Sequence, residues 1–262
     1  MKKRLTRFLP FLLAFTIALP SYSVFAEEEN QAKETQTNET NETQADETTA
    51  NDTLSLAAET AVLIDAASGE ILYDKDADKK MYPASITKLM TILLALENGK
   101  LTDEITFSHD AVYNIEPGSA HIAILEGETL TLEQVLRAII LRSANEASNG
   151  VAEYVDGSVE AFAKHMTERA KELGCTNTNF VNANGLFDEN HYTTAHDMAL
   201  IARELLKHEE YRSMMSETDY EIPPTNLQTE TRYLHGQHQM LNPNSIYYYK
   251  DAITDDPNHP YG

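Results

Sequence analysis

The feature that most constrains this chain is the apolar run over residues 84–96, which reads ASITKLMTILLAL. The run is longer than a typical strand, it follows Pro83, and Asn98-Gly99 ends it. Its length and composition predict a helix that is buried in the core of the protein.

The folded part is expected to begin near Leu54 with two strands and to continue as a mainly helical region. Residues 60–66 and 70–74 are rich in β-formers, and the Ala-Ser-Gly between them indicates a hairpin. Thr131 and Gln134 have the spacing of a capping box at the start of an amphipathic helix. We expect helices over residues 131–141, 146–154, 159–173 and 194–207, and short strand-like alternations at 105–107 and 121–125. The sequence therefore indicates an α/β protein of the α+β kind.

The first 53 residues predict export and a linker. Four basic residues stand among the first seven, and the apolar stretch 8–19 that follows is too short to span a bilayer. Small residues around Ala26 fit a signal peptidase site, so 1–26 is expected to be a signal peptide, with a retained short anchor as the alternative. Residues 27–53 are acidic and contain no apolar residue larger than Ala, so we expect a disordered linker.

The composition excludes several classes of function. The chain has 42 acidic and 20 basic residues and a net charge of −22, which argues against a nucleic-acid partner. Cys175 is its one cysteine, so an internal disulfide is excluded, and this residue is expected to be a small buried hydrophobe. His235 and His238 lack a helical or cysteine context, and a Gly-rich phosphate loop is missing from the sequence. We therefore expect neither a metal nor a cofactor.

Ser85 and Lys88 form the first candidate catalytic pair. They stand three residues apart at the predicted helix start, so their side chains share one face. A serine beside a lysine amine is an activated nucleophile when burial or nearby cations lower the pKa of that amine. The helix N-terminus adds N–H groups that would stabilise an oxyanion. Because an isolated Ser-x-x-Lys also arises by chance, the pair needs a second feature.

Ser143 and Asn145 provide that second feature after a long apolar helix. Taken alone, Ser143 fits the N-cap of the next helix. Taken with Ser85 and Lys88, it supplies a hydroxyl for proton relay, while Asn145 supplies an amide to hold a substrate backbone. Ser-x-x-Lys followed by Ser-[Asp/Ala]-Asn is the order found in penicillin-recognising serine enzymes.

On these motifs the chain resembles the D-alanyl-D-alanine carboxypeptidases, the low-molecular-mass penicillin-binding proteins of serine peptidase family S11. Residues 83–91, PASITKLMT, look like the active-site segment, and residues 143–147, SANEA, look like the second motif. Similarity to the family's intervening helical region continues over residues 168–178, 180–186 and 191–199. The resemblance runs from about Thr60 to Ile253. It implies a β-lactamase/transpeptidase-like fold with a helical subdomain and an antiparallel sheet.

The resemblance also implies a role for each matching residue. Ser85 would attack the carbonyl of the penultimate D-Ala of a peptidoglycan stem peptide, with Lys88 as the general base. Ser143 would relay the proton to the leaving amine, and Asn145 would hydrogen-bond the substrate backbone. Water would then hydrolyse the acyl-enzyme, and a β-lactam would acylate the same serine. Such an enzyme would serve peptidoglycan biosynthesis and cell shape from the cell wall or the outer side of the membrane.

The sequence departs from the family pattern near its end. Family members carry Lys-Thr-Gly on a central strand, where it binds the substrate carboxylate and supplies the second oxyanion N–H. Residues 247–253 look like the approach to that strand, but the triplet does not occur in the chain. Pro257 and Pro260 would each remove a ladder N–H, so the tail 254–262 is not expected to replace the strand. We therefore expect an incomplete domain over residues 54–253, an incomplete sheet, no C-terminal membrane anchor and reduced activity.

Three functions stay open on the sequence. The first is the carboxypeptidase. The second is a non-catalytic cell-wall binding protein or broken gene product, which the missing triplet favours. The third is a class A β-lactamase, which would carry Ser-Asp-Asn and a Glu-x-x-Leu-Asn deacylating loop; the chain has Ser-Ala-Asn and lacks that loop.

We predict that the exported form begins at Glu27 and that residues 27–52 are readily cut by proteases. A signal-like start followed by an acidic tract without hydrophobes is the reason. N-terminal sequencing of secreted material, combined with limited proteolysis, measures both. A mature protein that still carries residues 8–19, or a protease-resistant linker, would contradict the prediction.

Overall fold

The computed structural model describes residues 56–239, 241, 242 and 244. The predicted signal peptide, the linker over 27–53 and the tail over 254–262 lie outside the described residues. The described part is an α+β arrangement of helices with three two-stranded antiparallel sheets. Its helices are all too short or too polar to cross a membrane.

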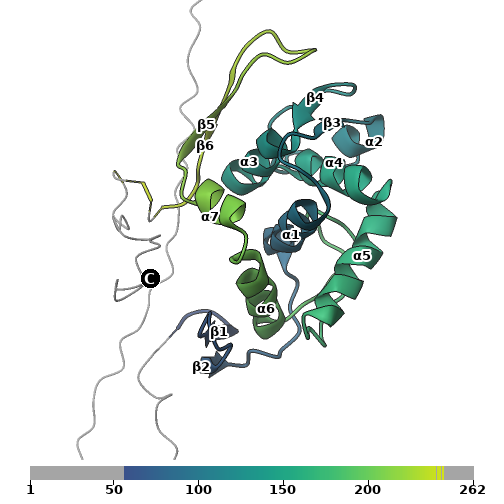
Figure 1. The fold of residues 1–262 in the computed structure, drawn as a ribbon. Helices are drawn as coiled ribbons and strands as arrows, with labels where there is room; N and C mark the ends of the chain where they lie inside the picture. Colours follow the sequence, from purple (N-terminus) through teal and green to yellow (C-terminus); the bar gives the residue numbers. More distant parts are fainter. Residues whose placement is uncertain (1–55, 240, 243, 245–262) are drawn as a thin grey trace, which may run out of the picture. The chain divides into compact units, whose positions relative to one another are not determined.

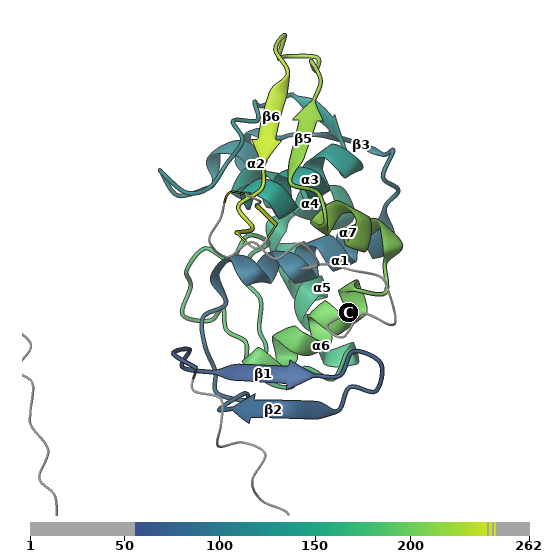
Figure 2. The same cartoon turned by 90° about the vertical axis from the view of Figure 1, so that its left-hand side faces the viewer.

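The chain enters this part through a hairpin of strands β1 (Ala61–Ile64) and β2 (Ile71–Lys75), which confirms the predicted pair. Helix α6 (Ala195–Leu205) lies beside β1 (Figure 2). The guanidinium of Arg203 on α6 donates to two carbonyls of the hairpin turn, those of Ala66 and Ala67, at 2.7 Å each. These bonds attach the turn to the helical part.

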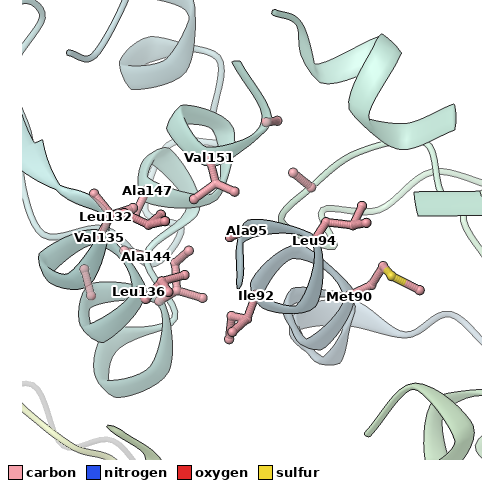
Figure 3. Packing of buried hydrophobic residues seen from close by; sticks show 14 of the residues in the cluster. Met90, Ile92, Leu94, Ala95, Leu132, Val135, Leu136, Ala144, Ala147 and Val151 are labelled. Atoms are coloured by element: carbon pink, nitrogen blue, oxygen red, sulfur yellow. The ribbon is translucent and has the colours of Figure 1, made fainter. Parts of the chain in front are cut away.

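Helix α1 (Lys88–Asn98) is the centre of the described fold, and the short 3₁₀ turn η1 (Ala84–Thr87) leads into it. The predicted helix is therefore confirmed, except that its first turn is 3₁₀. The buried run from Met90 to Ala95 faces neighbours on several sides, because α1 contacts α3 (Leu132–Arg142), α4 (Asn145–Asp156), α5 (Val159–Glu172) and α6 (Figure 1). Figure 3 shows Ala95 and Ile92 facing α3 and α4, with Met90 on the opposite side.

The helix ends follow the sequence signals closely. Thr131 and Gln134 form the predicted capping box at the start of α3, with side chain and backbone bonded in both directions. Ser158 and Thr194 cap α5 and α6 through their hydroxyls. Each cap satisfies N–H groups that a helix start leaves without partners.

The shorter elements were not predicted, or were predicted at other positions. The alternation at 105–107 forms strand β3 (Glu104–Thr106), but 121–125 is loop, and β3 pairs with β4 (Thr129–Thr131) instead. Helices α2 (His109–Tyr113) and α7 (Glu209–Met215) and the hairpin of β5 (Asp219–Ile222) and β6 (Arg232–His235) complete the fold. Elements of three to seven residues are too short to show a clear period.

Cys175 follows α5 and is 2% exposed, which confirms a small buried residue. Its Sγ lies 3.3 Å from the carbonyl oxygen of Asp197. Burial, together with the nearby charge of Asp197, raises the pKa of the thiol to about 12, so the thiol stays protonated and unreactive at neutral pH.

We predict that Gly150→Ala destabilises the fold. A Cβ at this position of α4 would lie 2.3 Å from a ring carbon of Phe107, which is 1% exposed and has no room to move away. Overpacking of this kind costs about 1–3 kcal/mol, and so short a contact with a buried ring belongs in the upper part of that range, above the gain of about 1 kcal/mol in helix propensity. Urea unfolding measures the change, and Phe107→Leu in the same chain should recover part of it. A Gly150→Ala protein as stable as the wild type would contradict the packing argument.

Candidate active site

The 3₁₀ turn before α1 presents Ser85 to solvent. Pro83 occupies the N-cap position, and Ser85 is exposed on the turn that follows. Ala84 has a φ of 49°, in the left-handed region that residues with a Cβ seldom adopt. The backbone next to Ser85 is therefore strained, as is common at functional sites.

Lys88 lies at the first residue of α1 and is 4% exposed. Its Nζ donates to the side-chain oxygen of Asn145 at 2.8 Å and to the carbonyl of Asn184 at 2.6 Å. The same Nζ lies 3.2 Å from Ser85 Oγ. A neutral amine has two hydrogens and one lone pair. When the two fixed oxygens take the hydrogens, the lone pair is left for the Ser85 hydroxyl.

The pKa of Lys88 fits this arrangement. Burial lowers it from 10.5 to about 8, and the charge of Glu146 opposes the shift. Glu146 is itself 1% exposed, and burial raises its pKa. One of its oxygens accepts from the Ile122 N–H at 2.7 Å, and the other has no hydrogen-bond partner among the described residues. A fraction of Lys88 is therefore a free base near neutral pH.

Ser143 joins the pair from the junction between α3 and α4. Its Oγ lies 3.0 Å from Ser85 Oγ and donates to it, so the Ser85 proton is free to face Lys88. Ser143 has a φ of 54° and is the C-cap of α3, whereas Ala144 is the N-cap of α4. The reading of Ser143 as a helix N-cap is therefore wrong, because the chain turns through a left-handed residue before the next helix begins.

Asn145 is the first residue of α4 and is 4% exposed. Its backbone N–H donates to the Ala120 carbonyl at 2.9 Å, and its amide oxygen holds Lys88. The four predicted residues Ser85, Lys88, Ser143 and Asn145 are thus brought together. Their catalytic roles stay predictions. The structure adds one contact for Asn145, which orients the candidate base.

Asn184 was not predicted as a site residue. Its segment, 180–186, resembled the family, but a main-chain carbonyl leaves no residue-type signal in a sequence. Its side chain donates to Asn149 Oδ1 at 3.1 Å, and the loop also accepts a 2.6 Å bond from Thr91 Oγ1 at the Ala183 carbonyl. The carbonyl that faces Lys88 is therefore held by α1 and α4.

A cavity of about 660 Å³ opens beside the side chains of Ser85, Lys88 and Ser143. Its walls are mostly apolar, from Leu89 and Ile92 of α1 across to Tyr211 of α7. His235 and His238 also line it, and the His235 ring pairs with Asp219 at 2.5 Å. Within the described residues, no three His, Cys, Asp or Glu side chains come together as a metal site would require.

The comparisons with known proteins decide the family. A family model described as D-alanyl-D-alanine carboxypeptidase, Peptidase_S11, matches residues 44–255. The chain belongs to the S11 family. This bears out the resemblance drawn from the PASITKLMT and SANEA segments.

Curated relatives and solved structures agree with the family. The D-alanyl-D-alanine carboxypeptidase DacF of Bacillus subtilis is 43% identical over 161 residues, which is 60% of this chain and 41% of that protein. The structure of penicillin binding protein 5 from Haemophilus influenzae is 30% identical, with a TM-score of 0.64, over 72% of this chain and 54% of that one. The S216A mutant of Streptomyces K15 DD-transpeptidase shares the fold, with a TM-score of 0.68 over 73% of this chain and 78% of that one, at 24% identity. The predicted penicillin-binding fold is therefore confirmed.

The chain spans about two fifths of the length of the curated relatives that it matches. Family membership and fold are established for the matched part.

The depressed pKa of Lys88 predicts stability that rises with pH. The unfolded chain keeps a proton on this amine up to pH 10.5, whereas the folded protein keeps it only up to about 8. As pH falls from 10.5 to 8, the unfolded state binds the extra proton and stability is lost, by about 1.4 kcal/mol per unit at most.

Urea unfolding at pH 7.5 and pH 10, on the wild type and Lys88→Met, measures the effect. Other titrating groups are common to both proteins, so the wild type should gain more stability than the variant between the two values. An equal gain in both would show that the amine is not desolvated.

Proposed function

We propose that this chain provides the acylating site of a serine-type D-Ala-D-Ala carboxypeptidase acting on peptidoglycan stem peptides. The observation that carries the proposal is the environment of Lys88, whose amine is fixed by two oxygens and turned toward Ser85. Membership in the S11 family supports the reaction class. The cavity beside Ser85 is of the size that small-ligand sites usually have.

In the first step, Ser85 Oγ attacks the carbonyl carbon of the penultimate D-Ala and its proton passes to Lys88 Nζ. Ser143 donates to Ser85 Oγ in the resting site, so it is placed to pass a proton onward when the tetrahedral intermediate collapses. The C–N bond then breaks as the proton taken by Lys88 returns through Ser143 to the leaving nitrogen. The terminal D-Ala leaves with a neutral amine, Lys88 is again a free base, and the acyl group remains as an ester on Ser85. General base catalysis of this kind contributes about 10²–10⁴-fold.

Water completes the cycle by attacking the Ser85 ester, with Lys88 accepting the proton from water. Lys88 then returns this proton to Ser85 Oγ as the ester bond breaks. A β-lactam would enter the same path through its strained amide and remain bound to Ser85 for longer. Asn145 would hold the substrate backbone in both cases. These roles carry over from the family pattern to the residues of this chain that match it.

The second candidate function is a non-catalytic cell-wall binding protein or broken gene product. A class A β-lactamase is disfavoured, because Ser143-Ala144-Asn145 replaces Ser-Asp-Asn and the deacylating loop is missing. Export by the predicted signal peptide, action outside the cytoplasm and a role in cell shape belong to the same proposal.

We predict that benzylpenicillin adds one covalent adduct to residues 27–262 and that Ser85→Ala abolishes it. Lys88→Ala should slow the formation of the adduct by about 10²-fold or more, because it removes the base. Intact-mass spectrometry over time measures both rates, and release of D-Ala from a peptide ending in D-Ala-D-Ala measures turnover.

Ser213→Ala is the matched control, since Ser213 is exposed on α7 and does not line the cavity. It should react like the wild type. A wild-type protein that forms no adduct would favour the non-catalytic reading. An adduct that survives Ser85→Ala would place the nucleophile elsewhere.

A further inference from the structure

His191 is distant from Ser85 in the sequence but is buried against the turn that carries it. The ring is 2% exposed, and its Nε2 lies 2.8 Å from the hydroxyl of Thr87, the last residue of η1. Its Nδ1 accepts from the backbone N–H of Val181 at 3.1 Å. Phe180 packs edge-on against the ring, with the ring centres 5.5 Å apart.

These contacts fix the protonation of His191. Because Nδ1 accepts a hydrogen bond, the ring proton lies on Nε2, which therefore donates to Thr87. Burial lowers the pKa of His191 to about 4, against the charge of Asp188. The ring is neutral at neutral pH. With both nitrogens bonded to the protein, it serves as a rigid bridge between two segments.

The two segments that His191 joins lie on either side of Lys88, the candidate base. Thr87 belongs to the turn that carries Ser85, and Val181 begins the loop whose Asn184 carbonyl accepts from Lys88 at 2.6 Å.

The loop and the turn also touch directly at Gly185, which has a φ of 84°. A Cβ there would lie 1.9 Å from the Ala84 carbonyl oxygen and 2.9 Å from Thr87 Oγ1. Only a residue without a Cβ allows this approach.

We propose that His191 is a positioning residue: by joining the Ser85 turn to the 181–186 loop, it holds the Asn184 carbonyl against Lys88 and keeps the amine aimed at Ser85. The importance of this arrangement for catalysis rests on the proposed function. The arrangement itself is a property of the fold and is measured without any reaction.

The test is to titrate Lys88 in four proteins: the wild type, His191→Phe, Thr87→Val and His165→Phe. NMR of lysine labelled with ¹³C at Cε monitors the titration, and the signal that is lost in Lys88→Met identifies Lys88. His191→Phe keeps the ring but loses both hydrogen bonds, and Thr87→Val removes only the hydroxyl at the other end. His165→Phe is the control, because His165 makes a comparable 2.9 Å contact with Asp156 away from the site.

We expect a wild-type midpoint near pH 8 and a lower midpoint in His191→Phe and Thr87→Val. The reason is that the ammonium loses a carbonyl acceptor that favours its charged form. Glu146, the charged group beside Lys88, is unchanged in all four proteins, and His165→Phe should keep the wild-type midpoint.

Penicillin acylation adds a second measurement. A shift of about 1 Å in a catalytic group costs about 10²-fold in rate, so both variants should acylate more slowly by up to this factor. If His191→Phe does not fold, the Thr87→Val protein decides.

A Lys88 midpoint that is unmoved or raised in the folded variants would overturn the proposal, even if acylation slowed. Failure of the wild type to acylate would instead count against the proposed function and would leave the titration result intact.

Discussion

The burial of one amine is the constraint on which the site depends. A buried ammonium is costly unless it is paired, and a carboxylate directly on it would raise its pKa and weaken it in the proposed role of a base. Lys88 is instead held by two neutral oxygens, from Asn145 and Asn184. The start of α4 and the 181–186 loop must therefore both lie against the first turn of α1. The apolar packing around Met90 to Ala95 fixes them there.

Two of the four non-glycine residues with a positive φ in the described part of the chain lie at the two serine hydroxyls. Ala84 precedes Ser85, and Ser143 itself adopts a left-handed conformation, although neither is glycine. Such residues persist only where surrounding contacts determine them. The capped helices and the interior packing supply those contacts, and they fix the backbone conformation at Ala84 and Ser143.

Local signals in the sequence predicted the parts of the site that lie close together in the chain. The spacing of Ser85 and Lys88 places them on one helix face, and Thr131 with Gln134 marks a helix start, because both depend only on neighbouring residues. Asn184 contributes a main-chain carbonyl, and His191 acts through the loop and the turn. Residue type therefore could not predict that either belongs to the site. The strands β5 and β6, of four residues each, are set by pairing with each other rather than by pattern.

The separation of the site's parts along the chain has a consequence for folding. The partners of Ser85 and Lys88 stand 57, 58 and 96 residues away, so they arrive only when long-range contacts form, which is late in folding. Until then the amine is hydrated, keeps its proton and leaves the serine inert. An acylating compound would therefore label only the molecules that have finished folding.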